Sequence, residues 1–441
     1  MRGALVMVGL AACGSHAASH GDASSGDAPN IAGRFPLAVS ADGRSVVQHD
    51  GTPLLFHGEA AWSLIAEPTS DQAEQYLTDR AQRGVVTILV NLIEHKFCDH
   101  PPDDAAGDAP FTTPDDFTSE NEAYFAHADD IIDRAAAHGI AVMLFPSYLG
   151  YQGGDEGWYA AMSALTPAQC TQYGTYVGQR YANRTNIIWM WGGDYTPPSG
   201  SAGETCMKAI ADAIRAAAPG ALASAHWTQE STSRDEPLFA PLVDLVGVYT
   251  YNPIPPLCAT ARAGSPARPS YLLETTYENE HSAPVSAIRA QQWWAMLACG
   301  AGEISGNNPI WLFGSGWPQQ LGSPLSKDQQ QLAAIVGPMH WPAMAPDATL
   351  VTAGSGSGNQ AVIATRTTDG TQALVYLPPG AASSITLDLS HMAGATTATW
   401  YDPTTGAMQA AGSGLTGSQT LQPPGKNAAG DGDWLLALIA P

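Results

Sequence analysis

IIWMWGGDYTP, at residues 187–197, is the stretch of sequence that decides the fold. Its first five residues, Ile187–Trp191, are all apolar, as expected for a short strand that is buried on both of its faces. Two glycines then end the run, and the next residue is Asp194. We interpret this stretch as a core strand that carries a carboxylate to the rim of a sheet.

A second stretch of the same kind, YLLETTYE, occupies residues 271–278. It is a short β-prone run that ends in a carboxylate, Glu274, which lies 80 positions after Asp194 (274 − 194). Two carboxylates at strand ends of one scaffold are the minimum equipment for cleaving a glycosidic bond.

Eight β-prone runs alternate with helical patterns from Pro36 onward, which indicates a parallel sheet with crossover helices. The expected strands are Leu54–Gly58, Val85–Leu92, Ala141–Pro146, Ile187–Trp191, Leu222–His226, Leu245–Tyr251, Tyr271–Glu274 and Gly302–Ser305. The expected helices include Ser70–Arg83, Glu120–His138, Pro167–Tyr181, Glu204–Ala218 and, after the last strand, Lys327–Gly337. Eight such units in about 300 residues predict a (β/α)8 TIM barrel.

The character of the sequence changes beyond Pro346. Short alternating runs separated by Gly, Ser, Asn and Asp follow without a helical pattern, which predicts an antiparallel β-sandwich. The expected fold is therefore α/β, a TIM barrel with a C-terminal sandwich. The expected domains are a signal peptide at 1–13, a flexible tether at 14–32, the barrel at 33–345 and the sandwich at 346–441.

The N-terminus resembles the signal peptide of a bacterial lipoprotein. Arg2 precedes an apolar run, and LAAC at residues 10–13 matches a lipobox, in which Cys13 would be lipidated. The segment is too short to span a bilayer, and the Ser, Ala, Gly, His and Asp that follow are typical of a tether. We therefore expect an extracytoplasmic protein of the cell envelope that contacts the membrane only through its lipid anchor. A plain secretory signal with a chance cysteine is the alternative.

Composition limits the partners and cofactors. The net charge of −23, with only 13% charged residues, leaves no basic surface for nucleic acid. Apart from Cys13, five cysteines remain, which allow at most two disulfides and one free thiol. Their spacing matches no metal motif, and the acidic loop at 98–116 lacks EF-hand spacing. We expect a monomer without a metal or cofactor. The loop is expected to be a solvated acidic insertion, with calcium binding as the alternative, and its place over the barrel mouth would make it a lid or a subsite wall.

Asp194 and Glu274 are the candidate catalytic pair. The active site of such a barrel lies at the C-terminal ends of its strands, and these residues end the fourth and seventh expected strands. In retaining glycosidases of this fold those two strands supply the acid/base and the nucleophile. The charge of Glu274 would raise the pKa of Asp194, as an acid that must begin protonated requires. The structural alternative is that Asp194 caps the following segment and Glu274 pairs with an arginine.

Three segments resemble the apiosidase-like glycoside hydrolases, whose barrel is followed by a domain labelled collagen-binding. They are LFHGEAAWSL at 55–64, IIWMWGGDYTP at 187–197 and LETTYE at 273–278, and in the tail TWYDPTTG at 399–406 and DWLL at 433–436 are similar to that second domain. The resemblance implies Asp194 as general acid/base and Glu274 as nucleophile. It departs at Glu59, where Asp is commoner, and at Thr275, where proline is commoner. Both residues would line the pocket. The departures therefore leave the expected reaction type unchanged but not the expectation that the sugar is apiose.

Other residues at strand ends are candidates for binding substrate. They are Glu59, Trp62, Asn91, His226, Trp227, Tyr249, Tyr251, Tyr277, Glu278 and Trp311. Glu59 could instead anchor the barrel rim through hydrogen bonds, and Glu278 is the rival nucleophile. Buried packing with a satisfied hydroxyl is the alternative for the tyrosines.

Taken together, the sequence predicts an exported retaining glycoside hydrolase that acts on a carbohydrate. It would release a terminal sugar, apiose-like or another furanose or pyranose, from a complex polysaccharide by a two-carboxylate double displacement. Two alternatives remain: a non-catalytic surface lipoprotein that binds glycan or matrix, and an endo-acting glycanase on the same fold. We expect the sandwich to pack on the barrel as a stability or orientation module.

Overall fold

The computed structural model describes residues 33–441 of the chain. The expected signal peptide, Cys13 and the whole of the expected tether therefore lie outside the described residues. In the described part of the chain, no helix combines the length and the apolar character that crossing a membrane requires.

Eight parallel strands form the barrel, and each overlaps one of the expected strands. They are β4 (Phe56–Ala60), β5 (Thr87–Asn91), β6 (Ala141–Phe145), β7 (Ile187–Gly192), β8 (Ala223–His226), β10 (Val246–Tyr249), β11 (Ser270–Glu274) and β12 (Gly300–Ser305). Their order is β8-β7-β6-β5-β4-β12-β11-β10, with the short β9 (Ser231–Thr232) antiparallel at the β10 edge. The Leu245 N–H donates to the Ala223 carbonyl at 3.1 Å, which brings β8 to β10 and nearly closes the barrel. The predicted TIM barrel is confirmed.

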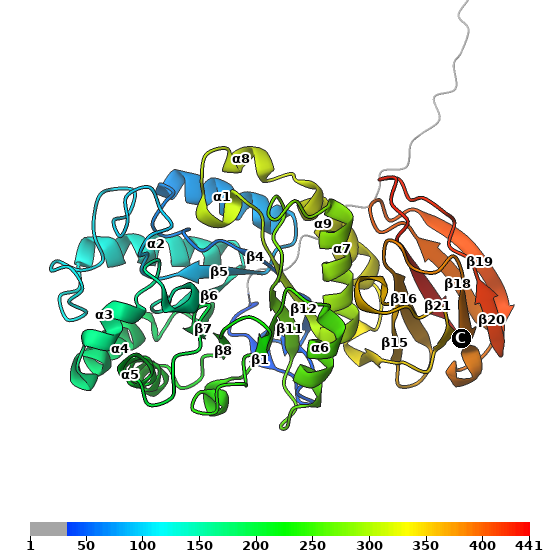
Figure 1. Cartoon of the computed structure of the whole chain (residues 1–441), viewed down its shortest axis with the longest axis horizontal. Helices are drawn as coiled ribbons and strands as arrows, with labels where there is room; N and C mark the ends of the chain where they lie inside the picture. Colours follow the sequence, from blue (N-terminus) through cyan, green and yellow to red (C-terminus); the bar gives the residue numbers. More distant parts are fainter. Residues whose placement is uncertain (1–32) are drawn as a thin grey trace, which may run out of the picture. The chain divides into compact units, whose positions relative to one another are not determined.

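Helices surround the strands (Figure 1). They are α1 (Ser70–Gln82), α2 (Glu122–Ala137), α3 (Tyr159–Ala164), α4 (Pro167–Tyr181), α5 (Ala202–Ala217), α6 (Ile254–Ala263), α7 (Val285–Trp294), α8 (Trp317–Gln320) and α9 (Pro324–Val336). Capping boxes begin α1 and α4, where the Thr69 and Thr166 side chains accept from backbone N–H groups three residues on.

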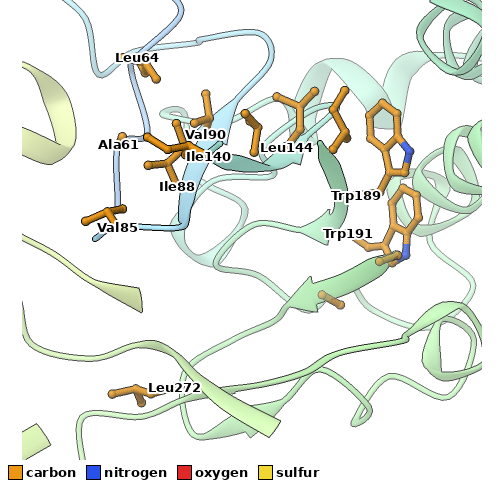
Figure 2. Packing of buried hydrophobic residues seen from close by; sticks show 14 of the residues in the cluster. Ala61, Leu64, Val85, Ile88, Val90, Ile140, Leu144, Trp189, Trp191 and Leu272 are labelled. Carbon is orange, nitrogen blue, oxygen red and sulfur yellow. The ribbon is translucent and has the colours of Figure 1, made fainter. Parts of the chain in front are cut away.

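Strand β7 shows why its sequence decides the fold. Trp189 and Trp191 belong to the core cluster between strands and helices, whereas Ile188 and Met190 belong to the cluster inside the barrel. Side chains alternate between the faces of a strand, so a strand buried on both faces needs an uninterrupted apolar run. Figure 2 shows Trp189 and Trp191 on the helix-facing side, in the cluster that also contains Leu144.

A small antiparallel sheet precedes the barrel. It comprises β1 (Ala38–Val39), β2 (Val46–Val47) and β3 (Pro53–Leu54). Leu37, Val46 and Leu54 join the cluster inside the barrel, and because β3 leads into the N-terminal end of β4, the sheet covers that end. The opposite end, where the strands finish, remains for the site.

Two disulfides connect outer elements of the barrel. Cys170–Cys206 joins α4 to α5, and Cys258–Cys299 joins α6 to the residue before β12. Cys98 is a free, buried thiol, and burial raises its pKa to about 12. The five described cysteines thus form the two disulfides and one free thiol that their number allows.

The C-terminal residues form two antiparallel sheets. One contains β13 (Met344–Pro346), β15 (Ile363–Thr367), β16 (Gln372–Leu377), β21 (Trp434–Ile439), β18 (Thr396–Tyr401) and β19 (Met408–Leu415); the other contains β14 (Val351–Ala353), β17 (Ile385–Asp388) and β20 (Ser418–Leu421). The predicted β-sandwich is confirmed. The short runs in the sequence predict strands at 350–352, 360–366, 371–376, 384–388, 397–401 and 433–439. Strands β19 and β20 are not among them, because their small and polar residues lack an apolar alternation.

The sandwich packs directly on the barrel. The Trp293 ring of α7 stacks on the Tyr376 ring of β16, with centroids 5.7 Å apart, and the Trp294 indole N–H donates to the Ala361 carbonyl at 2.9 Å. Tyr376 and Leu435 belong to the same hydrophobic cluster as the outer core of the barrel. The outer core of the barrel therefore extends onto one face of the sandwich, whose interior is a separate apolar cluster.

Candidate active site

A pocket at the C-terminal ends of the barrel strands contains both candidate carboxylates. Its volume is about 130 Å³, and it is lined by Trp62, Phe97, Tyr148, Asp194, Glu274, Tyr277, Glu280 and Trp311. Asp194 is the second residue after β7, and Glu274 is the last residue of β11. The barrel thus brings together two acids that are 80 positions apart in the sequence (274 − 194).

The backbone of the Gly-Gly-Asp turn directs Asp194 into this pocket. Gly192, Gly193 and Asp194 all have positive φ angles, of 87°, 117° and 59°. The Gly193 N–H donates to the His226 carbonyl at 2.8 Å, which ties the turn to the end of β8. Positive φ is uncommon for a non-glycine residue and costs energy, and such strain tends to cluster at functional sites.

The environment of Asp194 favours the protonated form of its carboxyl group. Burial is the main cause that raises its pKa to about 6, and the negative charge of Glu274 adds to the shift. The Tyr148 hydroxyl donates to Oδ2 at 3.4 Å, whereas Oδ1 has no hydrogen-bond partner among the described residues. Oδ1 is therefore a buried acceptor without a partner, which adds to the cost of ionising this carboxyl group.

His226 connects the two carboxylate-bearing segments. Its Nδ1 accepts a hydrogen bond of 3.2 Å from the Asp194 N–H, which assigns the ring proton of the neutral imidazole to Nε2. Nε2 lies 3.0 Å from Oε2 of Glu274. One imidazole thus places a donor beside Glu274 and fixes the backbone of Asp194.

Trp62 and Tyr277 lie in the same pocket as Glu274. The Trp62 indole N–H donates to the Tyr277 hydroxyl at 3.1 Å, and all three residues line the pocket. The hydrogen bond fixes the Tyr277 side chain in the pocket wall.

The walls of the pocket are aromatic and its polar groups are acidic. Phe97 and Trp311 meet edge to face with centroids 5.1 Å apart, and Trp311 donates to Oε1 of Glu280 at 2.9 Å. The lining contains three carboxylates and neither lysine nor arginine among the described residues. Within residues 33–441 there is no group of His, Cys, Asp and Glu side chains placed to hold a metal ion. Such a pocket suits an uncharged ring with hydroxyl groups.

A comparison with protein families agrees with this geometry. The family model described as "Apiosidase-like, catalytic domain" matches residues 40–341. The chain belongs to the apiosidase-like family. It is therefore a glycoside hydrolase, and its substrate is a carbohydrate. A second model, "Putative collagen-binding domain of a collagenase", matches residues 345–439.

Solved structures show the same fold. A structure titled "Glycoside hydrolase" is similar with a TM-score of 0.78 and 23% identity over 92% of this chain and 97% of that one. A glycoside hydrolase family 5 protein from Bacteroides vulgatus ATCC 8482 is similar with a TM-score of 0.78 and 22% identity over 92% and 93% of the two chains. No curated protein matches the chain.

Several predicted site residues of the apiosidase-like enzyme lie at the pocket. Trp62, Tyr277 and Trp311 line it, and His226 and Tyr249 lie behind the carboxylates with ring centroids 4.6 Å apart. Tyr251 belongs to a neighbouring pocket. Asn91 ends β5 and is 2% exposed, on the barrel-interior face that it shares with Leu89, but it does not line the pocket.

Glu59 has the anchoring role that was one of its two expected roles, and Trp227 was predicted wrongly as a substrate-binding residue. Glu59 is 1% exposed, and its carboxylate accepts hydrogen bonds of 2.8 Å from both Arg80 and Tyr76 of α1. Trp227 packs in the outer core and donates to the Ser233 carbonyl at 3.0 Å. Both follow strand alternation onto the helix-facing side, so they stabilise the barrel and do not contact the pocket.

Glu278, the predicted rival nucleophile, also faces away from the pocket. Its two oxygens accept hydrogen bonds from the Asn307 side chain at 2.5 Å and the Leu325 N–H at 3.1 Å. It therefore anchors the loop after β11, and this prediction is corrected.

Three pocket residues were not predicted. Tyr148 lies three residues beyond the end of β6, and attention to strand ends alone could have identified it. Phe97 and Glu280 come from the loops after β5 and β11, where no periodic pattern indicates which side chains face inward. Glu280 Oε1 also accepts from the Asn308 amide at 3.2 Å.

Gly193→Ala is expected to lower kcat/KM by about 100-fold or more, because a small displacement of a catalytic group has that effect. A Cβ on Gly193 would lie 2.5 Å from the Tyr148 ring and 2.9 Å from the Leu149 nitrogen, so the turn that carries Asp194 must shift. The matched control is Gly200→Ala. Gly200 also has positive φ, of 76°, but a Cβ there meets nothing within 4 Å. We expect it to lose about 1 kcal/mol of stability and to keep its kcat/KM; equal losses of activity in the two variants would refute this explanation.

Proposed function

We propose that this apiosidase-like enzyme is a retaining exo-glycosidase that releases a terminal, uncharged sugar from a complex glycan. The observation that carries the proposal is the pairing of Asp194 and Glu274 in one small pocket, with burial and charge raising the pKa of Asp194 to about 6. One acid is thus suited to hold a proton, while the Nε2 atom of His226 lies 3.0 Å from the other.

The first step forms a covalent glycosyl-enzyme. A Glu274 oxygen attacks the anomeric carbon, the bond from that carbon to the leaving oxygen breaks, and Asp194 donates its proton to that oxygen. Ester formation removes the negative charge of Glu274, which lowers the pKa of Asp194 for the next step.

The second step releases the sugar. Asp194 removes a proton from a water molecule, the water oxygen attacks the anomeric carbon, and the bond to Glu274 breaks. The sugar leaves with its original anomeric configuration, and both carboxyl groups return to their starting protonation states.

The small size of the pocket supports exo action. Phe97, Tyr148 and Trp311 enclose about 130 Å³ around the carboxylates, which is below the volume usual for a site that binds a larger ligand. An endo-acting enzyme needs an open groove on both sides of the cleaved bond.

A screen of purified protein against aryl glycosides and complex plant and microbial glycans tests the proposal, with Asp194→Asn alongside. We expect wild type to release one monosaccharide, with retention of configuration by NMR at early times. Oligosaccharide products would favour the endo-acting alternative, and an inverted product would contradict the double displacement.

We also propose that the enzyme is exported and anchored through Cys13. The lipobox-like LAAC sequence and the two disulfides, which form in oxidising compartments, support this location. Labelling of cells with radioactive palmitate should mark the wild type and not Cys13→Ser; label in both would contradict the anchor.

The raised pKa of Asp194 predicts how activity depends on pH. Asp194 must be protonated in the free enzyme, so kcat/KM should be high below pH 6 and fall about tenfold per pH unit above it. NMR titration of Glu274→Gln provides the control, because removal of the neighbouring charge should lower the pKa of Asp194. A kcat/KM that stays constant from pH 6 to pH 8 would exclude Asp194 as the acid.

A further inference from the structure

A second pocket lies beside the catalytic one. It is lined by Tyr151, Gln229, Tyr251, Thr276 and His281, and its volume is about 640 Å³. Tyr151 and Tyr251 are each 44% exposed, which makes them the most exposed aromatic side chains of the described residues. The lining contains no Asp, Glu, Lys or Arg.

The second pocket shares supporting elements with the acid/base. The Gln152 N–H, next to Tyr151, donates to the Asp194 carbonyl at 3.3 Å. The Tyr251 ring meets the Tyr249 ring at a centroid distance of 5.6 Å, and the Tyr249 ring contacts that of His226, whose Nδ1 accepts from the Asp194 N–H. Asp194 is the group that would protonate the leaving oxygen. Because Tyr151 and Tyr251 are connected to the Asp194 segment, we place the second pocket on the side of the leaving group.

Neighbouring residues contact both exposed tyrosines. The Gln152 side chain donates to the Tyr151 hydroxyl at 3.1 Å, and the Tyr251 backbone N–H donates to Glu230 at 3.0 Å, which holds the main chain that carries the Tyr251 ring. The Tyr251 ring also meets the His281 ring at a centroid distance of 6.3 Å. Tyrosine has only two side-chain torsions, so its ring loses little conformational freedom when a ligand stacks on it.

Backbone strain gathers around the same pocket. Among the described residues eight non-glycine positions have positive φ, and five of them are at or near its lining: Gln152, Glu230, Asn279, His281 and Ser282. Such conformations cost about 1–3 kcal/mol each and cluster at ligand-binding sites. The strained residues lie in the loops that carry the side chains lining this pocket.

We infer that this pocket binds the sugar residue to which the released sugar is attached, and that this residue is uncharged. The inference rests on the proposed function and deepens it. Tyr151 and Tyr251 offer ring faces for a sugar ring, and Gln229 and Thr276 offer an amide and a hydroxyl to its hydroxyl groups. The preferred substrate is then an oligosaccharide or polysaccharide with a neutral penultimate residue, rather than a simple glycoside.

Kinetics of two substrates test the inference. They are the 4-nitrophenyl glycoside of the released sugar and the oligosaccharide from which the wild type releases it. In Tyr151→Ala and Tyr251→Ala, we expect the ratio of the oligosaccharide kcat/KM to the aryl-glycoside kcat/KM to fall about tenfold or more. The matched variants Tyr151→Phe and Tyr251→Phe keep the ring face and should retain most of the ratio. An unchanged ratio in the alanine variants would overturn the inference.

A binding experiment separates failure of this inference from failure of the proposed chemistry. Saturation-transfer NMR of Glu274→Gln with xylotetraose, mannotetraose, arabinotetraose and cellotetraose needs no turnover. We expect a signal from at least one of them, and its loss when Tyr151→Ala and Tyr251→Ala are added. A signal that survives both changes, or none from any tetrasaccharide, would overturn the inference. Full hydrolysis by Glu274→Gln would instead reject the proposed chemistry and leave this readout valid.

Discussion

Glu274→Gln is expected to lower kcat/KM on the order of 10⁴-fold or more, which is the usual scale for removing a nucleophile. In the wild type, His226 Nε2 lies 3.0 Å from Oε2 of Glu274. Glutamine keeps nearly the same volume, and its amide oxygen can occupy the position of Oε2. The protein should therefore fold normally, with unchanged circular dichroism, yet be unable to form the glycosyl-enzyme ester. The measurement is initial rate on the aryl glycoside that wild type cleaves fastest.

Azide distinguishes the nucleophile from a carboxylate that only supports the structure. In Glu274→Ala, azide should enter the space left by the side chain and form a glycosyl azide of inverted configuration. Glu278 provides the control because it lies four residues later and its two oxygens are bonded to Asn307 and Leu325. Azide should not rescue Glu278→Ala. Rescue at Glu278 and none at Glu274 would exchange their roles and refute our assignment.

The barrel could be predicted because its signals are local. Runs such as Ile187–Trp191 are apolar on both faces, and capping residues such as Thr69 and Thr166 begin helices, so element order follows from short windows of sequence. The strands β19 and β20 were missed for the converse reason. MQAAGSGL and SQTL have little apolar surface to bury, and only their pairing with β18 and β17 makes them strands.

The site could be predicted in part, because strand ends indicate where residues lie but not which way they face. Asp194 and Glu274 share a pocket, as their places after β7 and on β11 required. Glu59 and Trp227 also lie at strand ends, yet they face the helices. Glu280 comes from a loop whose path depends on tertiary contacts such as its bonds to Asn308 and Trp311. No periodicity in the sequence encodes these contacts.

The contact between barrel and sandwich gives the largest expected effect on stability. Arg289 of α7 is 1% exposed and donates to Asp433 through two nitrogens at 2.7 and 2.8 Å. It also bonds Asp328 of α9 at 3.0 Å and Asp431 at 2.8 Å. One guanidinium thus compensates three carboxylates, two of which, Asp328 and Asp433, are almost fully buried.

Arg289→Met is expected to destabilise the protein by about 3–5 kcal/mol, because breaking a buried ion pair from one side leaves uncompensated charge. Methionine retains much of the apolar stem, so the loss reports mainly on the charge. Urea unfolding at pH 7, followed by tryptophan fluorescence, measures it. Arg134→Met is the control, since Arg134 is 34% exposed and its pairs with Glu74 and Asp130 are screened by water. We expect the control to change stability by about 1 kcal/mol or less.

The pH dependence of Arg289→Met identifies the cause of its instability. Burial already raises the pKa of Asp328 to about 6, while Arg289 lowers it, so removal of Arg289 should raise that pKa further. When the pKa of a carboxyl group is higher in the folded state than in the unfolded state, the protein loses stability as the pH rises from the unfolded-state pKa through the folded-state pKa. The deficit relative to wild type should therefore be smaller at pH 5, where the buried carboxyls take up protons, than at pH 8. A deficit that is equal at both pH values would mean that lost packing, rather than uncompensated charge, destabilises the interface.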